Sequence, residues 1–179
     1  NKDKSLEFVF FSEEGKEIYR QPARVSKIEP KRGNIFGVYK GKGFIEEGIL
    51  IQTPMDFSKK NYASLRTLNQ ILKRLIFSNQ FAKEESFDIE AEDYEFLKYW
   101  MSRTPTEVDV PYYDSDHYYD SYCKFLMFGD LKGEMSDLIR IYNKVGLAHG
   151  TLTDVAYIKD DQGVEFLLAA TILVLSLIH

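Results

Sequence analysis

The chain has 179 residues and a formal net charge of −5, with 23 Lys and Arg against 28 Asp and Glu. A protein that holds nucleic acid by bulk electrostatics needs a basic face, so this composition argues against such a partner. Hydrophobic residues make up 44% of the chain, enough for a folded core. The single cysteine, Cys123, excludes an internal disulfide framework and a cysteine-based zinc site.

The longest apolar run indicates whether the chain can span a membrane, and its two ends indicate whether it is part of a longer protein. No apolar run approaches the roughly 18 residues of a membrane span, so we expect no transmembrane segment. The chain begins at Asn1 without methionine and ends at His179 directly after an apolar stretch. We therefore expect it to be a piece of a longer protein.

Residues 1–50 predict a strand-rich N-terminal segment. Leu6 to Phe11 favours a strand, and Glu14-Gly15 is typical of a turn. Two further strands are predicted over 34–39 and 44–51, separated by glycines that are typical of turns. We expect residues 51–179 to form a second region.

Two helices are predicted at the start of that second region. Over 58–77 the leucines recur at three- and four-residue steps, with Asp56 or Ser58 as the N-cap. Over 90–103 acidic residues favour the N-terminal end, and the proline that follows stops the helix. Within this second helix we expect Trp100 to anchor the core.

The remaining part of the chain predicts a loop and a meander. Residues 106–122 form an acidic, tyrosine-rich stretch that is typical of a loop. Three strands are predicted over 137–145, 150–159 and 164–175, and the turn residues 160–163 favour an antiparallel hairpin. Two helices followed by a meander indicate an α+β fold, in which an antiparallel sheet packs against helices.

A short motif, Asn143-Lys144-Val145-Gly146, lies near the end of the first of these strands. Gln52-Thr53-Pro54-Met55-Asp56 leads into the first helix, and two strands follow the motif. Over roughly residues 50–175 the chain resembles the C-terminal half of the class A β-lactamase-like, penicillin-recognising serine hydrolases. Its tyrosine-rich insertion is similar to versions in Bacteroidetes-type bacteria.

The resemblance implies a β-lactamase/transpeptidase-like fold, incomplete in this chain, and a periplasmic or exported bacterial enzyme. The implied reaction is acyl transfer from a β-lactam, or a cell-wall peptide-like amide or ester, to a serine and then to water. Neither a cofactor nor a metal is implied. Lys144 would supply the electrostatic catalytic charge, and Gly146 would leave room for a substrate backbone. The other substrate-binding candidates are Asn143, Val145, His149 and Thr151.

The sequence departs from the family's motifs at several points. Val145 stands where the family has a threonine, whose hydroxyl would bind the substrate carboxylate. The string Ser121-x-x-Lys124 lies twenty residues before Lys144, in the wrong order, and we interpret it as a chance match. The family's Ser-Asp-Asn and Glu-x-x-Leu-Asn strings are absent. We therefore expect the nucleophilic serine to come from a missing N-terminal half of the same protein.

Other interpretations remain open at this point. A non-catalytic module would use the tyrosine-rich loop to bind cell-wall peptide, glycan or another protein. Asp114, Asp116 and Asp120 are a weak calcium candidate, and His117 with His149 a weaker zinc candidate, because neither set has ligand spacing. An exposed apolar strand at the C-terminal end would also favour a homo-oligomer.

Overall fold

The computed structural model describes residues 4–25, 27, 36–60 and 63–173, and it falls into two units, Asn1–Gly37 and Val38–His179. The division expected at residue 50 therefore lies inside the second unit. Among the described residues, no helix has the length and apolar character needed to cross a bilayer.

The first unit is a β-hairpin. Strand β1 (Phe8–Phe11) pairs antiparallel with β2 (Glu17–Gln21), and the register shifts between Phe10 and Phe11. The predicted turn is confirmed, because Gly15 adopts a φ of 78° that favours glycine. Arg20 forms an ion pair with Glu7 across this hairpin and another with Glu17 on its own strand.

The second unit begins with a short hairpin enclosed by a second antiparallel strand pair. Strand β3 (Tyr39–Lys40) pairs with β6 (Met55–Asp56), and β4 (Phe44–Glu46) pairs with β5 (Ile49–Ile51). The prediction of one strand over 44–51 is wrong, because Glu47 and Gly48 adopt φ angles of 49° and 80° and turn the chain back. Of the strand predicted over 34–39, residues 34–35 lie outside the described residues.

Helix α1 (Leu65–Ile76) begins later than the sequence predicts. The Asp56 carboxylate accepts a hydrogen bond from the Ser58 backbone at 2.8 Å, which closes a local turn and does not start a helix. Ser64 is the N-cap, and its hydroxyl accepts from the Thr67 backbone at 3.0 Å. Two single turns follow α1, η1 (Ser78–Gln80) and η2 (Lys83–Glu85).

Helix α2 (Ala91–Ser102) confirms the second predicted helix. Its N-terminus carries a reciprocal capping box between Glu90 and Asp93. The prediction that Trp100 anchors the core is wrong, because this side chain is 46% exposed. After α2 come the single turns η3 (Pro105–Glu107) and η4 (Asp120–Cys123), then the short segment α3 (Phe125–Phe128).

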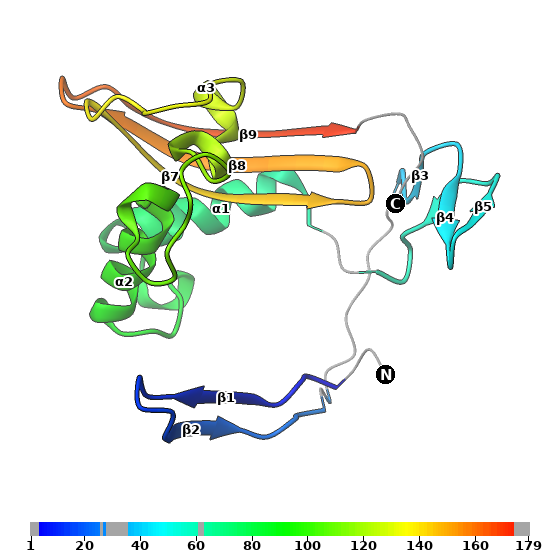
Figure 1. Ribbon diagram of the computed structural model, residues 1–179, viewed down its shortest axis with the longest axis horizontal. Coiled ribbons are helices and arrows are strands. Elements are labelled where there is room, and N and C mark those ends of the chain that lie inside the picture. Colours follow the sequence, from blue (N-terminus) through cyan, green and yellow to red (C-terminus); the bar gives the residue numbers. More distant parts are fainter. Residues whose placement is uncertain (1–3, 26, 28–35, 61–62, 174–179) are drawn as a thin grey trace. The chain divides into compact units, whose positions relative to one another are not determined.

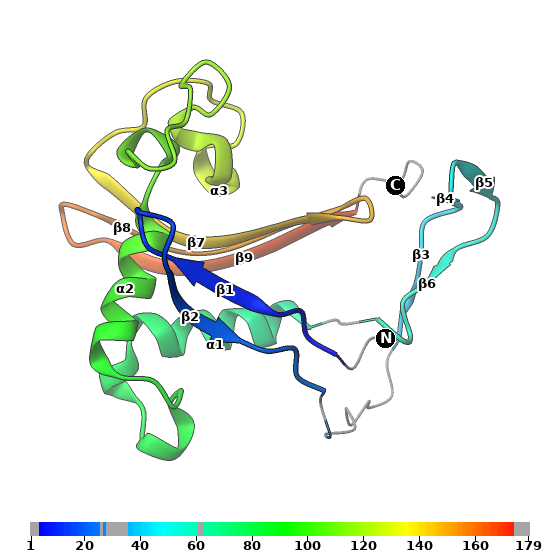
Figure 2. The same ribbon diagram turned by 60° about the horizontal axis from the view of Figure 1, so that its bottom comes forward.

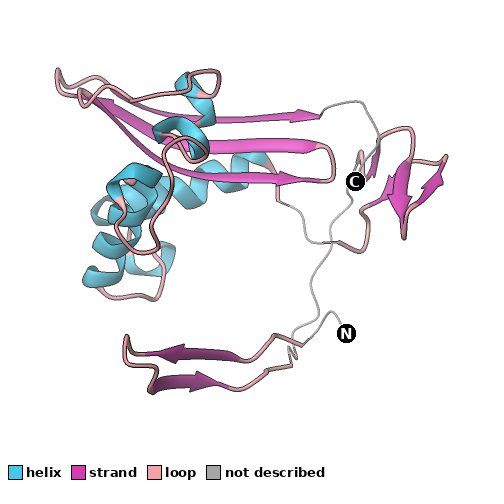
Figure 3. Ribbon diagram, in the orientation of Figure 1, coloured by secondary structure: helices cyan, strands magenta, loops and turns pink. Residues whose placement is uncertain are grey.

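The main sheet consists of β7 (Ile139–Ala148), β8 (Thr151–Asp160) and β9 (Glu165–Leu173), in that order and antiparallel. The three predicted strands and the turn between the last two are confirmed, while residues 174–175 lie outside the described residues. Figure 3 distinguishes this sheet from the helices that cover it. Strand β7 is an edge strand, because it pairs only with β8 among the described strands.

The two faces of the main sheet pack against different elements (Figures 1 and 2). On one face Leu72 of α1 packs against Val155 and Tyr157 of β8. On the other face Ile141, Ala156 and Ile158 pack against the α3 segment. The α+β prediction of an antiparallel sheet packed against helices is therefore confirmed at this level.

Candidate functional site

Lys144 stands exposed on edge strand β7, beside the end of α2. Its Nζ donates a hydrogen bond to the Val145 carbonyl at 2.6 Å, and no carboxylate within the described residues forms an ion pair with it. Two of its three N–H groups thus remain for another acceptor. Two residues further along the strand, Gly146 is also exposed, and a Cβ added there would meet nothing within 4 Å.

Asn143 points into the protein, unlike its neighbour Lys144. Its amide nitrogen donates to the Cys123 carbonyl at 2.7 Å and to the Asp154 carboxylate at 2.9 Å. Its amide oxygen accepts from the Lys124 ammonium at 2.8 Å. Both N–H groups of the amide are therefore in use, and a ligand would have to replace one of these partners to receive a hydrogen bond from Asn143.

His149 and Thr151 lie at the hairpin end of β7 and β8, away from Lys144. His149 has a φ of 51° in the turn, and its ring packs edge-on against Phe57 at 5.2 Å between centroids. The register pairs Gly146 with Thr153, so Thr151 lies opposite Ala148 instead. Thr153 is therefore the threonine beside the Lys144–Gly146 stretch, and it shares a sheet face with Lys144.

A cavity of about 450 Å³ opens between the end of α2, the tyrosine-rich loop and β7. Asn143, Lys144 and Val145 contribute to its β7 side. We call it the aromatic cavity, because its other walls are mainly aromatic and aliphatic: Trp100, Met101, Pro105, Val108, Val110, Pro111, Tyr113, Tyr118 and Tyr122. The structure thus brings three of the six predicted site residues together at one cavity.

The chance match Ser121-x-x-Lys124 is buried, at 2% exposure for each residue. The Ser121 hydroxyl donates to the Leu131 carbonyl. The Lys124 ammonium donates to the Met101 carbonyl at 2.9 Å, to the Ile141 carbonyl at 3.0 Å and to Asn143. All three of its protons are therefore used in holding α2, the loop and β7 together.

Burial changes the titration of two side chains at this junction. It lowers the pKa of Lys124 to about 8, against the attraction of the Asp154 carboxylate, which favours the ammonium. It also raises the pKa of the Cys123 thiol, although Lys124 and Lys144 favour the thiolate. Since the thiolate is the reactive form, Cys123 is a poor nucleophile.

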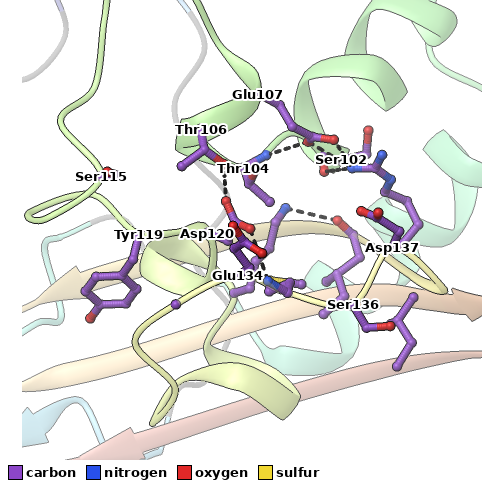
Figure 4. Close-up of a pocket in the computed structure, with 16 residues that line it drawn as sticks. Ser102, Thr104, Thr106, Glu107, Ser115, Tyr119, Asp120, Glu134, Ser136 and Asp137 are labelled. Atoms are coloured by element: carbon purple, nitrogen blue, oxygen red, sulfur yellow. Dashed lines mark hydrogen bonds and ion pairs between the residues drawn. The ribbon is translucent and has the colours of Figure 1, made fainter.

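A second, polar cavity of about 540 Å³ lies on the other side of the loop (Figure 4). Burial would raise the pKa of Glu107, but hydrogen bonds from the Thr104 backbone and Arg140 outweigh it, so the pKa lies below its usual range. Arg140 reaches both Glu107 oxygens, at 2.8 and 2.9 Å. Asp120 accepts from the Thr106 hydroxyl and from the Met135 backbone. The carboxylates of Glu107 and Asp120 are thus engaged in holding the loop.

The loop's other charged residues do not assemble a metal site. Asp114 accepts from the His117 ring at 2.7 Å and from the Asp116 backbone at 3.0 Å, while Asp120 is bound elsewhere. Within the described residues no group of three or more His, Cys, Asp or Glu side chains is placed to hold a metal ion. The weak calcium and zinc candidates therefore gain no support from the geometry.

Sequence reasoning gave no role in this region to Arg103, which also lines the aromatic cavity, to Lys124 or to Thr153. The two-residue turn His149-Gly150 would have fixed the register and identified Thr153. Lys124 carried no local signal, because its partners lie 17 to 23 residues away along the chain.

We compared the chain with protein-family models, with curated proteins and with solved structures, and none of the three comparisons gives a match.

Proposed function

We propose that residues 51–179 form the lysine-bearing wall of the active site of a β-lactamase-like serine hydrolase. The enzyme would transfer the acyl group of an amide or ester to a serine and then to water, with the serine on a segment N-terminal to this chain. The observation that carries the proposal is the placement of Lys144. This exposed ammonium lies on an edge strand at an apolar cavity, without an ion-pair partner among the described residues.

The surroundings of Lys144 fit this role. An ammonium at the edge of an apolar cavity raises the local positive potential, which stabilises the charge that develops on the attacked carbonyl oxygen. The open space at Gly146 leaves room for a substrate backbone to approach the strand.

The nearest candidate nucleophiles in the described chain do not compete with an external serine. Ser121 is buried and donates to a carbonyl. The ammonium of its neighbour Lys124 donates to three other acceptors, so it has no lone pair with which to take the Ser121 proton. Cys123 is disfavoured as a thiolate by burial. The proposed chemistry therefore depends on a serine from another segment.

The test is to label the product of the complete reading frame with a fluorophosphonate, which modifies activated serines. We expect one adduct, mapped by mass spectrometry to a serine outside these 179 residues. Lys144→Ala should slow labelling by about 100-fold, the scale of a lost electrostatic contact. The matched control is Lys83→Ala, an exposed lysine on η2.

Two outcomes would contradict the proposal: no adduct on the folded protein, or equal labelling rates for the Lys144 and Lys83 variants. A thermal melt of each variant separates loss of charge from loss of fold. Cell fractionation tests the implied export, since the protein should leave with the periplasmic or secreted fraction.

A second candidate is a non-catalytic module that binds cell-wall peptide or glycan. The observation in its favour is the aromatic cavity itself, since rings on a loop can stack on a flat ligand without any nucleophile. This candidate predicts no fluorophosphonate adduct on the complete protein, together with retained ligand binding.

A further inference from the structure

The aromatic cavity has a connected wall of rings. Tyr118 packs edge-on against Tyr113 at 5.3 Å and against Tyr122 at 5.0 Å between ring centroids. Trp100 faces the cavity from the end of α2 and remains 46% exposed. Half-exposed rings of this kind still gain from covering by a flat apolar group.

The charge of this cavity is opposite to that of the chain. Its lining contains the three cations Arg103, Lys124 and Lys144, and no Asp or Glu. The chain as a whole carries 28 acidic residues against 23 basic ones. A low-dielectric hollow whose only charged lining residues are cations attracts an anion.

Of the three cations, Lys144 has N–H groups to offer to a ligand. Lys144 uses one N–H on the Val145 carbonyl, whereas Lys124 uses all three inside the protein. Arg103 stacks over the Tyr99 ring at 4.0 Å, and its Nη1 forms an ion pair with the Glu107 carboxylate at 3.6 Å. An acid group at the cavity would therefore bind at Lys144.

The loop that carries the tyrosines is held at both ends. Glu107 binds Arg140 of β7 near its start, and the Cys123 carbonyl accepts from Asn143 near its end. Asp120 adds a bond to the Met135 backbone at 3.0 Å. Because protein groups alone make these bonds, little ordering free energy has to be lost when a ligand binds.

We propose that the aromatic cavity binds a small carboxylate that bears an aromatic ring, with the ring against Tyr118 and Trp100 and the carboxylate at Lys144. This ligand would narrow the amide or ester substrate of the proposed hydrolase to one that carries a ring and a carboxylate, so the inference rests on the proposed function. Binding itself needs no nucleophile and is measurable on this chain.

The test uses Trp100, the one tryptophan of the chain, as a fluorescent reporter inside the cavity. N-acetyl-L-phenylalanine is titrated against the 179-residue chain with excitation at 295 nm, where the ligand does not absorb. We expect saturable quenching or a blue shift. N-acetyl-phenylalaninamide and N-acetyl-alanine, which lack the charge and the ring respectively, should each bind about tenfold more weakly.

Matched variants assign the two contacts. Lys144→Gln should weaken binding of the carboxylate about tenfold and leave binding of the amide unchanged, while Lys83→Gln changes neither. Tyr118→Leu should weaken both ligands, whereas Tyr112→Leu, on the same loop but 82% exposed and outside the cavity lining, should not.

Equal affinity for the acid and the amide, or no saturable signal with any ligand, would overturn the inference. Failure of the proposed function looks different. In that case the complete protein takes no fluorophosphonate, yet this chain still distinguishes acid from amide.

Discussion

The two faces of the main sheet are stabilised by different physics. On the α1 face Leu72 inserts between Val155 and Tyr157, and the contacts are apolar. On the α3 face a small apolar cluster adjoins a buried chain of polar groups, Lys124, Asn143 and Asp154. The α1 face gains free energy from area removed from water, whereas the α3 face depends on each buried polar group finding its partner.

This difference separates what can be predicted from the sequence from what cannot. The α1 face follows from the periodic leucines of one helix and the alternation of one strand, and both patterns are local. The polar chain joins α2, the loop, β7 and β8, so no window of sequence contains it. It is also the structure that fixes the loop over the candidate site.

Removing the charge from the polar chain of Lys124, Asn143 and Asp154 should have the largest effect on the free energy of unfolding. Lys124→Met leaves two carbonyls and the Asn143 amide without their donor, and it leaves the Asp154 carboxylate uncompensated. Breaking a buried charged network in this way costs about 3–5 kcal/mol. Urea denaturation should show that loss, and Lys83→Met, on the surface, should lie within about 0.5 kcal/mol of the native protein. A loss for Lys124→Met no larger than that of the control would refute the polar chain as a stabilising element.

Substitutions on the apolar α1 face should lower the free energy of unfolding by less. Leu72 is 2% exposed, so Leu72→Ala should cost about 3 kcal/mol from lost burial and the cavity that remains. Its neighbour Ile71 is 40% exposed, and Ile71→Ala should cost about 1 kcal/mol or less. Thermal melts of the two variants compare them directly. Equal losses would mean that α1 does not use this face for packing.

The polar chain should also make stability depend on pH in an unusual direction. Burial lowers the pKa of Lys124 to about 8, whereas lysine in an unfolded chain titrates near 10.5. Between these two pH values Lys124 is protonated in the unfolded state and largely deprotonated in the folded state. Stability from this group therefore rises with pH through that window, by up to about 3 kcal/mol.

Two other groups act in the opposite direction and have to be controlled. The raised pKa of the Cys123 thiol and that of the Tyr157 hydroxyl both make stability fall as the pH rises. Urea midpoints are therefore measured from pH 7 to 9.5 in a Cys123→Ser background, below the range in which Tyr157 titrates. A midpoint that falls over this range would contradict the buried ammonium.

The smallest effect concerns the start of α1. Ser64→Ala removes the hydroxyl that accepts from the Thr67 backbone and should cost about 1 kcal/mol. Ser64→Asp keeps an acceptor and should stay within a few tenths of a kcal/mol of the native protein. Equal losses for the two variants would mean that the helix begins elsewhere.

The helix boundaries and the site illustrate the limits of sequence reasoning in particular residues. Asp56 and Ser64 are both good caps, and only the local turn at Asp56 decides between them. Trp100 is a large apolar residue of the kind usually buried in a core, yet it lines the aromatic cavity because the loop packs beside it. Lys144 could be selected from its motif, whereas the rings and the second cation around it depend on how the loop folds back.

The most direct test of the account is where a ligand binds. In a ¹⁵N-labelled sample of this chain, addition of N-acetyl-L-phenylalanine should shift the indole N–H of Trp100 and the backbone amides of Tyr118 and Lys144. The backbone amide signals of residues that line the polar cavity, such as Glu134 and Asp137, should not shift. Shifts confined to the polar cavity, or none at all, would contradict the assignment of the aromatic cavity as the working site.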